Sequence, residues 1–296
     1  MLMKYVITKE FTGKTIKEFL KLNYISGNLI KKLKKIENGI LVNSIHQNVT
    51  YHLQENDILE IKDEDFEGDT NEFLLPVDLP IEIIFEDENI TVVNKPSNMP
   101  THQSLNNHNN TLANALKYRY RDKPYVFRAS NRLDKDTSGV VITANNRYYA
   151  SLISNKIKEG SVTKEYIAIV NGKVEGGGVI DAPIDRIEKS IIKRTVRPDG
   201  ESAVTEYKVI CSCDEISVLS VFPKTGRTHQ IRVHMAHIGH PIVGDGLYFE
   251  KSDYIDRQAL HCRKMAVLGI GEYIAPLPDD MLNLIRRYFD NEESLF

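Results

Sequence analysis

The first forty residues contain two runs in which apolar positions recur every three or four residues. One run lies in 15–23 and the other in 29–36, and this spacing is typical of short amphipathic helices. Either Ser26 or Asn28 can cap the start of the second helix. Gly39 stands where a left-handed residue would end that helix. The pattern therefore predicts two helices followed by a turn.

Farther along the chain, runs of apolar residues predict strands. Residues 81–85 and 90–94 flank a polar loop, as in a β-hairpin. Residues 203–211 and 216–222 predict a second antiparallel pair, and a helical pattern starts at Thr111. This mixture predicts an α+β fold in which helices pack around a mixed, mostly antiparallel sheet.

Charge is distributed unevenly along the chain. The 296 residues are 41% hydrophobic and 27% charged, which is the composition of a folded protein of about two domains. The net charge of −3 hides a partition. Residues 1–62 have ten Lys and Arg against six Asp and Glu, whereas residues 63–90 have eleven Asp and Glu and no basic residue. Mildly basic regions thus flank an acidic stretch.

The acidic stretch predicts a domain boundary near residue 75. We expect a small α/β domain at 1–62, a solvated linker at 63–80 and a larger domain at 81–296. An acidic loop on one continuous domain is the alternative interpretation. The sequence shows no internal repeat and no low-complexity tract.

Neither export nor membrane anchoring is indicated by the sequence. Lys4 and Lys9 interrupt the N-terminus before an apolar signal region forms, and no apolar run approaches the roughly 18 residues of a membrane span. The three cysteines are expected to be reduced thiols, because an odd number without a signal peptide does not form a disulfide framework. We therefore expect a soluble cytoplasmic protein with no membrane partner.

Residues 132–138 form the densest polar segment of the larger domain. They include one arginine, one lysine, two carboxylates and two hydroxyls, directly before the apolar strand at 140–143. Such charge beside a buried strand indicates a functional site. A turn stabilised by local bonds between side chains and backbone is the ordinary alternative.

The segment 224–241 has glycines on both sides of a predicted helix at 228–238. Thr228 and Arg232 share a face near its N-terminal end, which suits a phosphate or a carboxylate. A metal-dependent nuclease or phosphoesterase is a rival interpretation, with the ligands His229, His234, His237 and Asp245. That interpretation is disfavoured because H-E-x-x-H spacing is missing and Arg232 would repel a cation. We expect most of these histidines to form hydrogen bonds or to pack.

Two further patterns have ordinary structural explanations. The strand pattern at 163–172 places Tyr166 on the same face as Ala168, and such a tyrosine is more often a core or cross-strand aromatic than a catalytic group. Three lysines share one face of the second predicted helix, namely Lys31, Lys34 and Lys35. A basic face can bind phosphates by charge, although a solvated lysine face is common.

The lysine-bearing helix is followed by a turn at 37–43 and by a strand pattern within 51–61. In this order the elements resemble the ribosomal-protein-S-four-like RNA-binding domain. Ser44 and Asn56 stand where that family usually has glycine, and both residue types tolerate turn dihedrals. The resemblance implies that the small domain binds RNA, with contacts from Lys31, Lys34 and Lys35.

Four ordered motifs extend over the larger domain. They are V-V-N-K-P at 92–96, R-L-D-x-x-T-S-G at 132–139, K-E-Y-x-A-x-V-x-G at 164–172 and T-G-R-T-H-Q-I-R-V-H-M at 225–235. Together with the segments 257–261 and 276–281, they resemble the RluA-type pseudouridine synthases, many of which have the same kind of N-terminal domain. The sequence departs from that family at Asn131, where histidine is common.

The resemblance implies that the protein isomerises uridine in RNA to pseudouridine: the N-glycosidic bond breaks, the uracil turns and a carbon–carbon bond forms. The target base must be flipped out or single-stranded, because a stacked base is out of reach. Ribosomal RNA is the expected substrate and transfer RNA the alternative. A catalytically inactive RNA-binding protein is a further alternative, for which Asn131 is the one hint. No metal, nucleotide or flavin cofactor and no obligate protein partner is implied.

The resemblance also implies roles for individual residues. Asp134 matches the catalytic aspartate, which acts as a nucleophile or assists elimination at the ribose. Arg232 matches the basic residue that pairs with this carboxylate and favours its charged form. Tyr166 matches the tyrosine that lies against the uracil and is a candidate for proton handling. Substrate contacts are implied for Arg132, Arg227 and Lys95.

Overall fold

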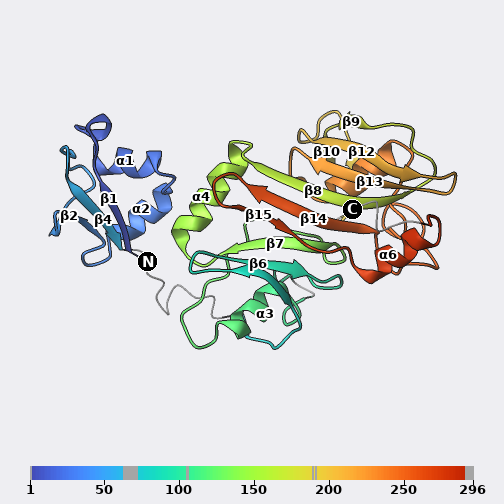
Figure 1. Ribbon diagram of the computed structural model, residues 1–296, viewed down its shortest axis with the longest axis horizontal. Helices are drawn as coiled ribbons and strands as arrows, with labels where there is room; N and C mark the ends of the chain where they lie inside the picture. Colours follow the sequence, from blue (N-terminus) through green and yellow to red (C-terminus); the bar gives the residue numbers. More distant parts are fainter. Residues whose placement is uncertain (1, 63–72, 105–106, 189, 191, 291–296) are drawn as a thin grey trace.

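The computed structural model of the protein describes residues 2–62, 73–104, 107–188, 190 and 192–290. Two main hydrophobic cores divide these residues into a small unit at the N-terminus and a large unit that follows. In Figure 1 the small unit, in blue, lies beside the helix α4 (Arg147–Lys158) of the large unit. Most of the predicted linker, at 63–72, lies outside the described residues.

The small unit is a four-stranded antiparallel sheet with the strand order β1-β4-β2-β3. Its elements are β1 (Leu2–Val6), the 3-10 turn η1 (Lys9–Phe11), α1 (Ile16–Leu22), α2 (Gly27–Leu33), β2 (Ile40–Val42), β3 (Ile45–His46) and β4 (Ile58–Lys62). Apolar side chains of both helices pack against β1, β2 and β4 to form its core. The two predicted helices are therefore present.

Side-chain caps fix the starts of these helices. Thr15 and Glu18 form a capping box on α1: Thr15 Oγ1 accepts from the Glu18 N–H at 3.2 Å, and Glu18 Oε2 accepts from the Thr15 N–H at 2.8 Å. Ser26 Oγ accepts from the Leu29 N–H at 3.1 Å, so Ser26 and not Asn28 caps α2. A cap of this kind stabilises a helix by about 1 kcal/mol.

The turn after α2 differs from the prediction. The left-handed residue is Asn38, with φ of 56°, and not Gly39. Glycine is required at position 39 because a Cβ there would lie 2.4 Å from the carbonyl oxygen of Leu33. Ser44 and Asn56 have φ of 65° and 66°, so these two residues do adopt left-handed turn conformations.

The large unit is built on a nine-stranded sheet with the order β5-β6-β7-β14-β8-β13-β12-β9, in which β15 also pairs with β14. The strands are β5 (Glu82–Glu86), β6 (Ile90–Lys95), β7 (Ser138–Ala144), β8 (Val162–Asn171), β9 (Gly178–Asp181), β12 (Val204–Ser212), β13 (Ile216–Pro223), β14 (Leu260–Val267) and β15 (Gly271–Ile274). The β7–β14 pair is parallel and the other pairs are antiparallel. The predicted α+β class and both predicted hairpins, β5–β6 and β12–β13, are confirmed.

Four helices add buried side chains to the core of this sheet. They are α3 (Leu112–Arg119), α4, α5 (Gln230–His237) and α6 (Asp279–Arg286), and a separate ribbon pairs β10 (Ile184–Arg186) with β11 (Arg194–Val196). α3 follows Thr111 as predicted. α5 begins two residues later than predicted, because His229 has a left-handed backbone with φ of 58°. Within the described ranges, no helix combines the length and the apolar character needed to cross a membrane.

The last part of the predicted linker packs on the large unit. Leu74 is buried. Asn114 Nδ2 donates to the carbonyl oxygen of Leu75 at 2.8 Å, and the Val77 N–H donates to the Asn114 carbonyl oxygen at 3.2 Å. The chain is therefore attached to α3 before β5 begins.

Candidate active site

Asp134 lies in the loop that leads into β7, and its neighbours in this loop are fixed. Leu133 is buried, and its backbone N–H and carbonyl both bond to the hydroxyl of Thr101, at 3.2 and 3.0 Å. The Asn131 side chain donates to one β7 carbonyl at 2.9 Å and accepts from a β7 N–H at 3.0 Å. Asn131 therefore pins this loop to the sheet, and the loop presents Asp134 from a rigid base.

The start of β7 approaches β14 so closely that only glycine fits. Gly139 has φ of 114°, and a Cβ there would lie 2.2 Å from the carbonyl oxygen of Cys262. One residue earlier, the Ser138 hydroxyl lies 2.9 Å from Nδ1 of the buried His261. These two contacts lock the end of the Asp134 loop against the central strands.

Arg232 of α5 meets the Asp134 carboxylate. Its Nη1 donates to Asp134 Oδ2 at 3.0 Å, which confirms the predicted pairing. Its Nε and Nη2 donate to the two carboxylate oxygens of Asp245, each at 2.7 Å. The exposed fraction of the side chain is 8% for Arg232, 1% for Asp245 and 22% for Asp134. Asp245 thus holds the guanidinium in place, while Asp134 is the more exposed carboxylate of this ion triad.

The members of the ion triad stabilise one another's charges. Burial by itself would lower the pKa of Arg232, but its bonds to Asp245 and Asp134 raise this pKa above its ordinary value. Arg232 is therefore a cation at any working pH. Sequence reasoning considered Asp245 only as a metal ligand and missed its bond to Arg232. The two residues lie 13 positions apart, without a helical or strand repeat to connect them.

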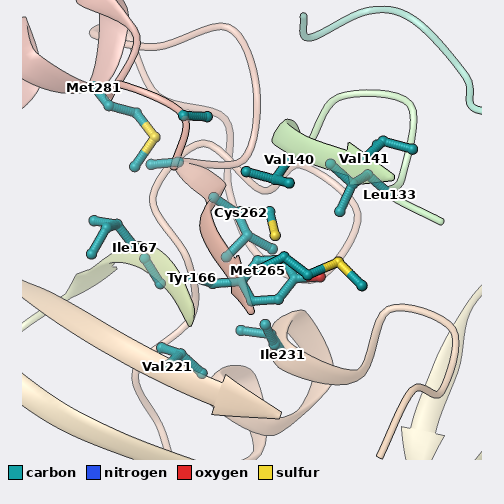
Figure 2. Close-up of a cluster of buried hydrophobic side chains, with 14 of the residues drawn as sticks. Leu133, Val140, Val141, Tyr166, Ile167, Val221, Ile231, Cys262, Met265 and Met281 are labelled. Atoms are coloured by element: carbon teal, nitrogen blue, oxygen red, sulfur yellow. The ribbon is translucent and has the colours of Figure 1, made fainter. Parts of the chain in front are cut away.

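Tyr166 of β8 is buried near the ion triad, with an exposed fraction of 8%. Figure 2 shows its ring among Cys262, Met265 and Ile231. Burial, followed by the neighbouring Cys262 and Asp134, raises the pKa of Tyr166 well above its ordinary value. The phenol therefore keeps its proton at neutral pH and can act as a hydrogen-bond donor.

The hydrophobic core also anchors the two charged residues that meet in the site. Leu133 directly precedes Asp134, and Ile231 directly precedes Arg232. Figure 2 shows both apolar side chains in the buried cluster around Tyr166. Burial of these side chains fixes the backbone on which the carboxylate and the guanidinium stand.

A family model described as RNA pseudouridylate synthase matches residues 89–237, about half of the chain, and this range includes Asp134, Tyr166 and Arg232. The chain belongs to the RNA pseudouridine synthase family. It is 37% identical over 280 residues to the uncharacterised RNA pseudouridine synthase YjbO of Bacillus subtilis, covering 92% of this chain and 98% of that protein. It is 36% identical over 231 residues to ribosomal large subunit pseudouridine synthase D of Escherichia coli K12, covering 71% of each. The resemblance to RluA-type synthases is thereby confirmed.

Solved structures share the fold of this synthase. The human RNA pseudouridylate synthase domain containing 4 superposes with a TM-score of 0.58 at 23% identity, covering 69% of this chain and 92% of that one. The human RNA pseudouridylate synthase domain containing 1 gives 0.56 at 27% identity, covering 67% and 83%. The protein is an isomerase that acts on RNA.

The synthase has a cleft of about 470 Å³ beside the ion triad, which we call the active-site cleft. Five of the predicted site residues line it: Asp134, Tyr166, Arg232, Arg132 and Arg227. Arg132 Nη2 donates to the Thr228 hydroxyl at 3.2 Å. Arg227 pairs with the exposed Glu201 and donates to a backbone carbonyl at 3.0 Å. The structure thus brings these five residues into one cleft.

Lys95, which was expected to contact the substrate, lies outside the active-site cleft. Its side chain is completely buried, and Nζ donates to the carbonyl oxygens of Pro96, Met99 and Lys135 at 2.7, 2.7 and 3.1 Å. All three ammonium donors are therefore used, and burial lowers the pKa of Lys95 to about 7. The predicted contact of Lys95 with substrate is wrong. Lys95 instead ties the end of β6 to the Asp134 loop.

The predicted RNA-binding lysines lie on the small unit. Lys31 is on α2, whereas Lys34 and Lys35 follow the end of this helix at Leu33. All three side chains are exposed, and they lie outside the walls of the active-site cleft. The structure leaves them on a separate surface.

Two histidines of the segment 224–241 form hydrogen bonds beside the site or in the core. His234 Nδ1 lies 2.8 Å from the Thr205 hydroxyl, and its Nε2 lies 2.9 Å from the carbonyl oxygen of Ala182. His229 Nδ1 lies 2.9 Å from the Tyr248 hydroxyl. Among the described residues, no three or more His, Cys, Asp or Glu side chains gather as a metal site would require. The hydrogen-bonding interpretation of these two histidines is confirmed.

Proposed function

We propose that this synthase isomerises uridine with Asp134 as its catalytic carboxylate, Arg232 as the partner of this carboxylate and Tyr166 as the residue against the uracil. The ion triad carries the proposal. A carboxylate that faces the cleft and is bonded to a buried cation has the charge that either a nucleophile or a group assisting elimination needs. Both chemical routes are compatible with this arrangement.

Tyr166 complements the carboxylate with a neutral ring. Its phenol is protonated and nearly buried at the wall of the active-site cleft. A protonated tyrosine offers an apolar face to a pyrimidine and one O–H donor at its edge. This combination suits a base that must be held and then turned.

The active-site cleft is suited to one extruded nucleotide. Its volume of about 470 Å³ falls within the range of about 300–1,000 Å³ of small-molecule sites, which supports entry of a flipped uridine. Arg132 and Arg227 are proposed to hold the flanking phosphates. The exposed ion pair of Arg227 with Glu201 contributes little in water, so a phosphate can replace the carboxylate at low cost.

Ribosomal RNA is the proposed substrate, and transfer RNA is the second candidate. Similar proteins from Xanthomonas campestris and Escherichia coli are named ribosomal large subunit pseudouridine synthase D. The catalytically inactive alternative is not favoured, because Asp134, Tyr166 and Arg232 line one cleft. Asn131, the one hint of inactivity, is engaged by two bonds to β7.

The small unit is proposed to be an RNA-binding domain of the ribosomal-protein-S-four-like kind. In this proposal residues 1–62 form that domain, 81–296 form the catalytic domain, and the linker at 63–80 is attached to α3 through its last residues. The separate core of the small unit and the exposed Lys31, Lys34 and Lys35 support it.

The function is tested with RNA whose uridines carry tritium on carbon 5. Forming the new carbon–carbon bond at this position releases tritium into water, so release reports turnover. We expect release from ribosomal RNA by the wild type and none by Asp134→Asn. Tritium release from transfer RNA alone would make transfer RNA the substrate in place of ribosomal RNA. No tritium release from either RNA would contradict the function. Mapping pseudouridines in a strain without this gene identifies the modified positions.

A further inference from the structure

His229 lies beside the ion triad at the start of α5. It lines the active-site cleft, and its Nε2 atom is 3.8 Å from Oδ2 of Asp134. Its backbone is left-handed, with φ of 58° and ψ of 20°. This conformation is uncommon for residues other than glycine, and backbone strain of this kind clusters at active sites. The proposed function leaves this side chain without a role.

Tyr248 contacts one ring nitrogen of His229 and favours a proton on the other one. The Tyr248 hydroxyl accepts from the backbone N–H of Arg194 at 3.0 Å and lies 2.9 Å from Nδ1 of His229. A hydroxyl has one proton to donate, and donating it to Nδ1 leaves the imidazole proton on Nε2. The Asp134 carboxylate near Nε2 favours the same tautomer, because an N–H there points toward negative charge. Both neighbours of the ring thus favour Nε2–H.

The surroundings of His229 favour its neutral imidazole. Burial, together with the cations Arg232 and Arg194, lowers the pKa of His229. The carboxylates of Asp134 and Asp245 act in the opposite direction but are outweighed. The ring therefore offers a single N–H donor. The 3.8 Å distance to Asp134 is too long for a direct hydrogen bond, so this donor is open to a third group.

A hydroxyl is the group that fits between His229 and Asp134. An oxygen about 2.8 Å from both Nε2 and Oδ2 would accept from the imidazole and donate to the carboxylate. A uracil carbonyl or a phosphate oxygen has no proton to donate, and Asp134 would repel it. In a nucleotide the 2′-hydroxyl is next to the carbon whose glycosidic bond breaks.

We propose that His229 and Asp134 together bind the 2′-hydroxyl of the flipped uridine, with Tyr248 as the positioning residue that selects the donor tautomer. The inference rests on the proposed role of Asp134. It adds a contact that distinguishes RNA from DNA at the target nucleotide.

The tautomer is tested by nitrogen-15 NMR of the full-length protein labelled in its histidine rings, in which protonated and unprotonated ring nitrogens resonate far apart. We expect a protonated Nε2 and an unprotonated Nδ1 for His229 at neutral pH. Tyr248→Phe should give a mixture of tautomers. A proton on Nδ1 of His229 in the wild-type protein would overturn the proposal. So would the same ring protonation in Tyr248→Phe as in the wild type.

The substrate contact is tested by single-turnover rates on RNA with and without the 2′-hydroxyl at the target uridine. His229→Ala should slow the normal substrate about 10-fold to 100-fold. Removing the 2′-hydroxyl should then slow His229→Ala less than it slows the wild type, because the bond to His229 is already lost and only the bond to Asp134 remains to be removed. His229→Asn keeps an N–H donor and tolerates the left-handed backbone, so it should recover part of the rate. Losses that multiply would overturn the proposal.

Two controls separate this inference from the proposed function. His237→Ala removes an exposed histidine of the same helix and should keep the wild-type rate. Asp134→Asn is measured in the same assay. A fully active Asp134→Asn protein would refute the proposed function. If Asp134→Asn is inactive but the rate losses from His229→Ala and from removing the 2′-hydroxyl multiply, the 2′-hydroxyl contact alone is refuted.

A second cleft carries a separate inference. This inter-unit cleft of about 880 Å³ lies between the small unit and α4, where Ser151 Oγ donates to the carbonyl oxygen of Tyr24 at 2.6 Å. One acidic residue, Glu159, faces five basic ones in its lining: Lys21, Lys32, Arg128, Arg147 and Lys158. Phosphate contacts with basic side chains dominate affinity for nucleic acids. We infer that the inter-unit cleft binds the RNA backbone away from the flipped uridine.

Charge reversal on both sides of the inter-unit cleft tests this inference. Lys21→Glu and Lys158→Glu change exposed lysines, one on each unit. Each should weaken RNA binding. Each should also reduce the slope of a plot of log affinity against log salt concentration by about one. Lys173→Glu, on the loop after β8, is the matched control, and effects no larger than those of this control would contradict the inference.

Discussion

The two units use positive charge in opposite ways. In the large unit Arg232 is buried and bonds two carboxylates at 2.7 to 3.0 Å. In the small unit Lys31, Lys34 and Lys35 are exposed and lie outside the active-site cleft. A buried guanidinium held by three bonds to carboxylates fixes the position and charge of one reacting group, whereas exposed ammonium groups attract phosphates without fixing geometry. We therefore expect chemistry and RNA affinity to respond to different substitutions.

The largest effect is expected from Arg232→Ala. It leaves the buried Asp245 without its cation, and such a loss typically destabilises a protein by about 3–5 kcal/mol. Turnover should fall strongly as well. Urea unfolding followed by circular dichroism measures the first effect, and tritium release measures the second.

Arg227→Ala is the comparison for that variant, because its ion pair with Glu201 is exposed. It should change stability by at most about 1 kcal/mol. Equal stability losses for Arg227→Ala and Arg232→Ala would contradict the distinction between buried and exposed cations.

Acid should destabilise the core behind the Asp134 loop. Burial lowers the pKa of His261 from its ordinary value of 6.5 to about 4. Between these values the unfolded chain binds more protons than the folded one, so the free energy of unfolding falls as pH falls through this window, by up to about 3 kcal/mol. Urea unfolding at neutral and acid pH should show a smaller decrease for His261→Asn. The same decrease in this variant would exclude His261 as a source of the acid sensitivity.

A smaller effect, on affinity alone, is expected from replacing Lys31, Lys34 and Lys35 with alanine together. The slope of a plot of log affinity against log salt concentration should decrease by about two to three, which corresponds to one phosphate contact for each lysine. The rate at saturating RNA should stay unchanged, because none of these residues lines the active-site cleft. A lower rate with unchanged affinity would reverse the assignment of the two surfaces.

The smallest effect is expected from Thr15→Ala, which removes the capping box of α1. Loss of such a cap costs about 1 kcal/mol. The small unit has its own core, so its unfolding midpoint in urea should fall while turnover on short RNA substrates stays at the wild-type rate. A parallel loss of turnover would show that the active site depends on the small unit.

Local patterns predicted much of the fold. The β5–β6 and β12–β13 hairpins and the helix after Thr111 follow from residue spacing and turn chemistry within a few positions. Asp134 and Arg232 are 98 residues apart, and their contact was expected only from the ordered motifs of the family. Spacing along the chain contains no information about such a pair.

The missed contacts depend on tertiary packing. Lysine at the end of a strand is usually exposed, but three backbone carbonyls converge on Lys95 from two segments. Asp245 and Tyr248 reach the site from the loop after α5, which has no regular repeat to indicate its direction. Gly39 was expected to be left-handed, yet it is needed for space beside Leu33. Each of these features depends on backbone atoms that meet only in the folded chain.

The most direct test compares Asp134→Asn with Asp136→Asn, two substitutions of equal size in the same loop. For each variant, RNA affinity and single-turnover pseudouridine formation are measured together. Asp134→Asn should abolish turnover and keep RNA affinity within a few-fold of the wild type, and Asp136→Asn should retain turnover. Parallel loss of affinity and rate in Asp134→Asn, or turnover that survives without the carboxylate, would contradict the account.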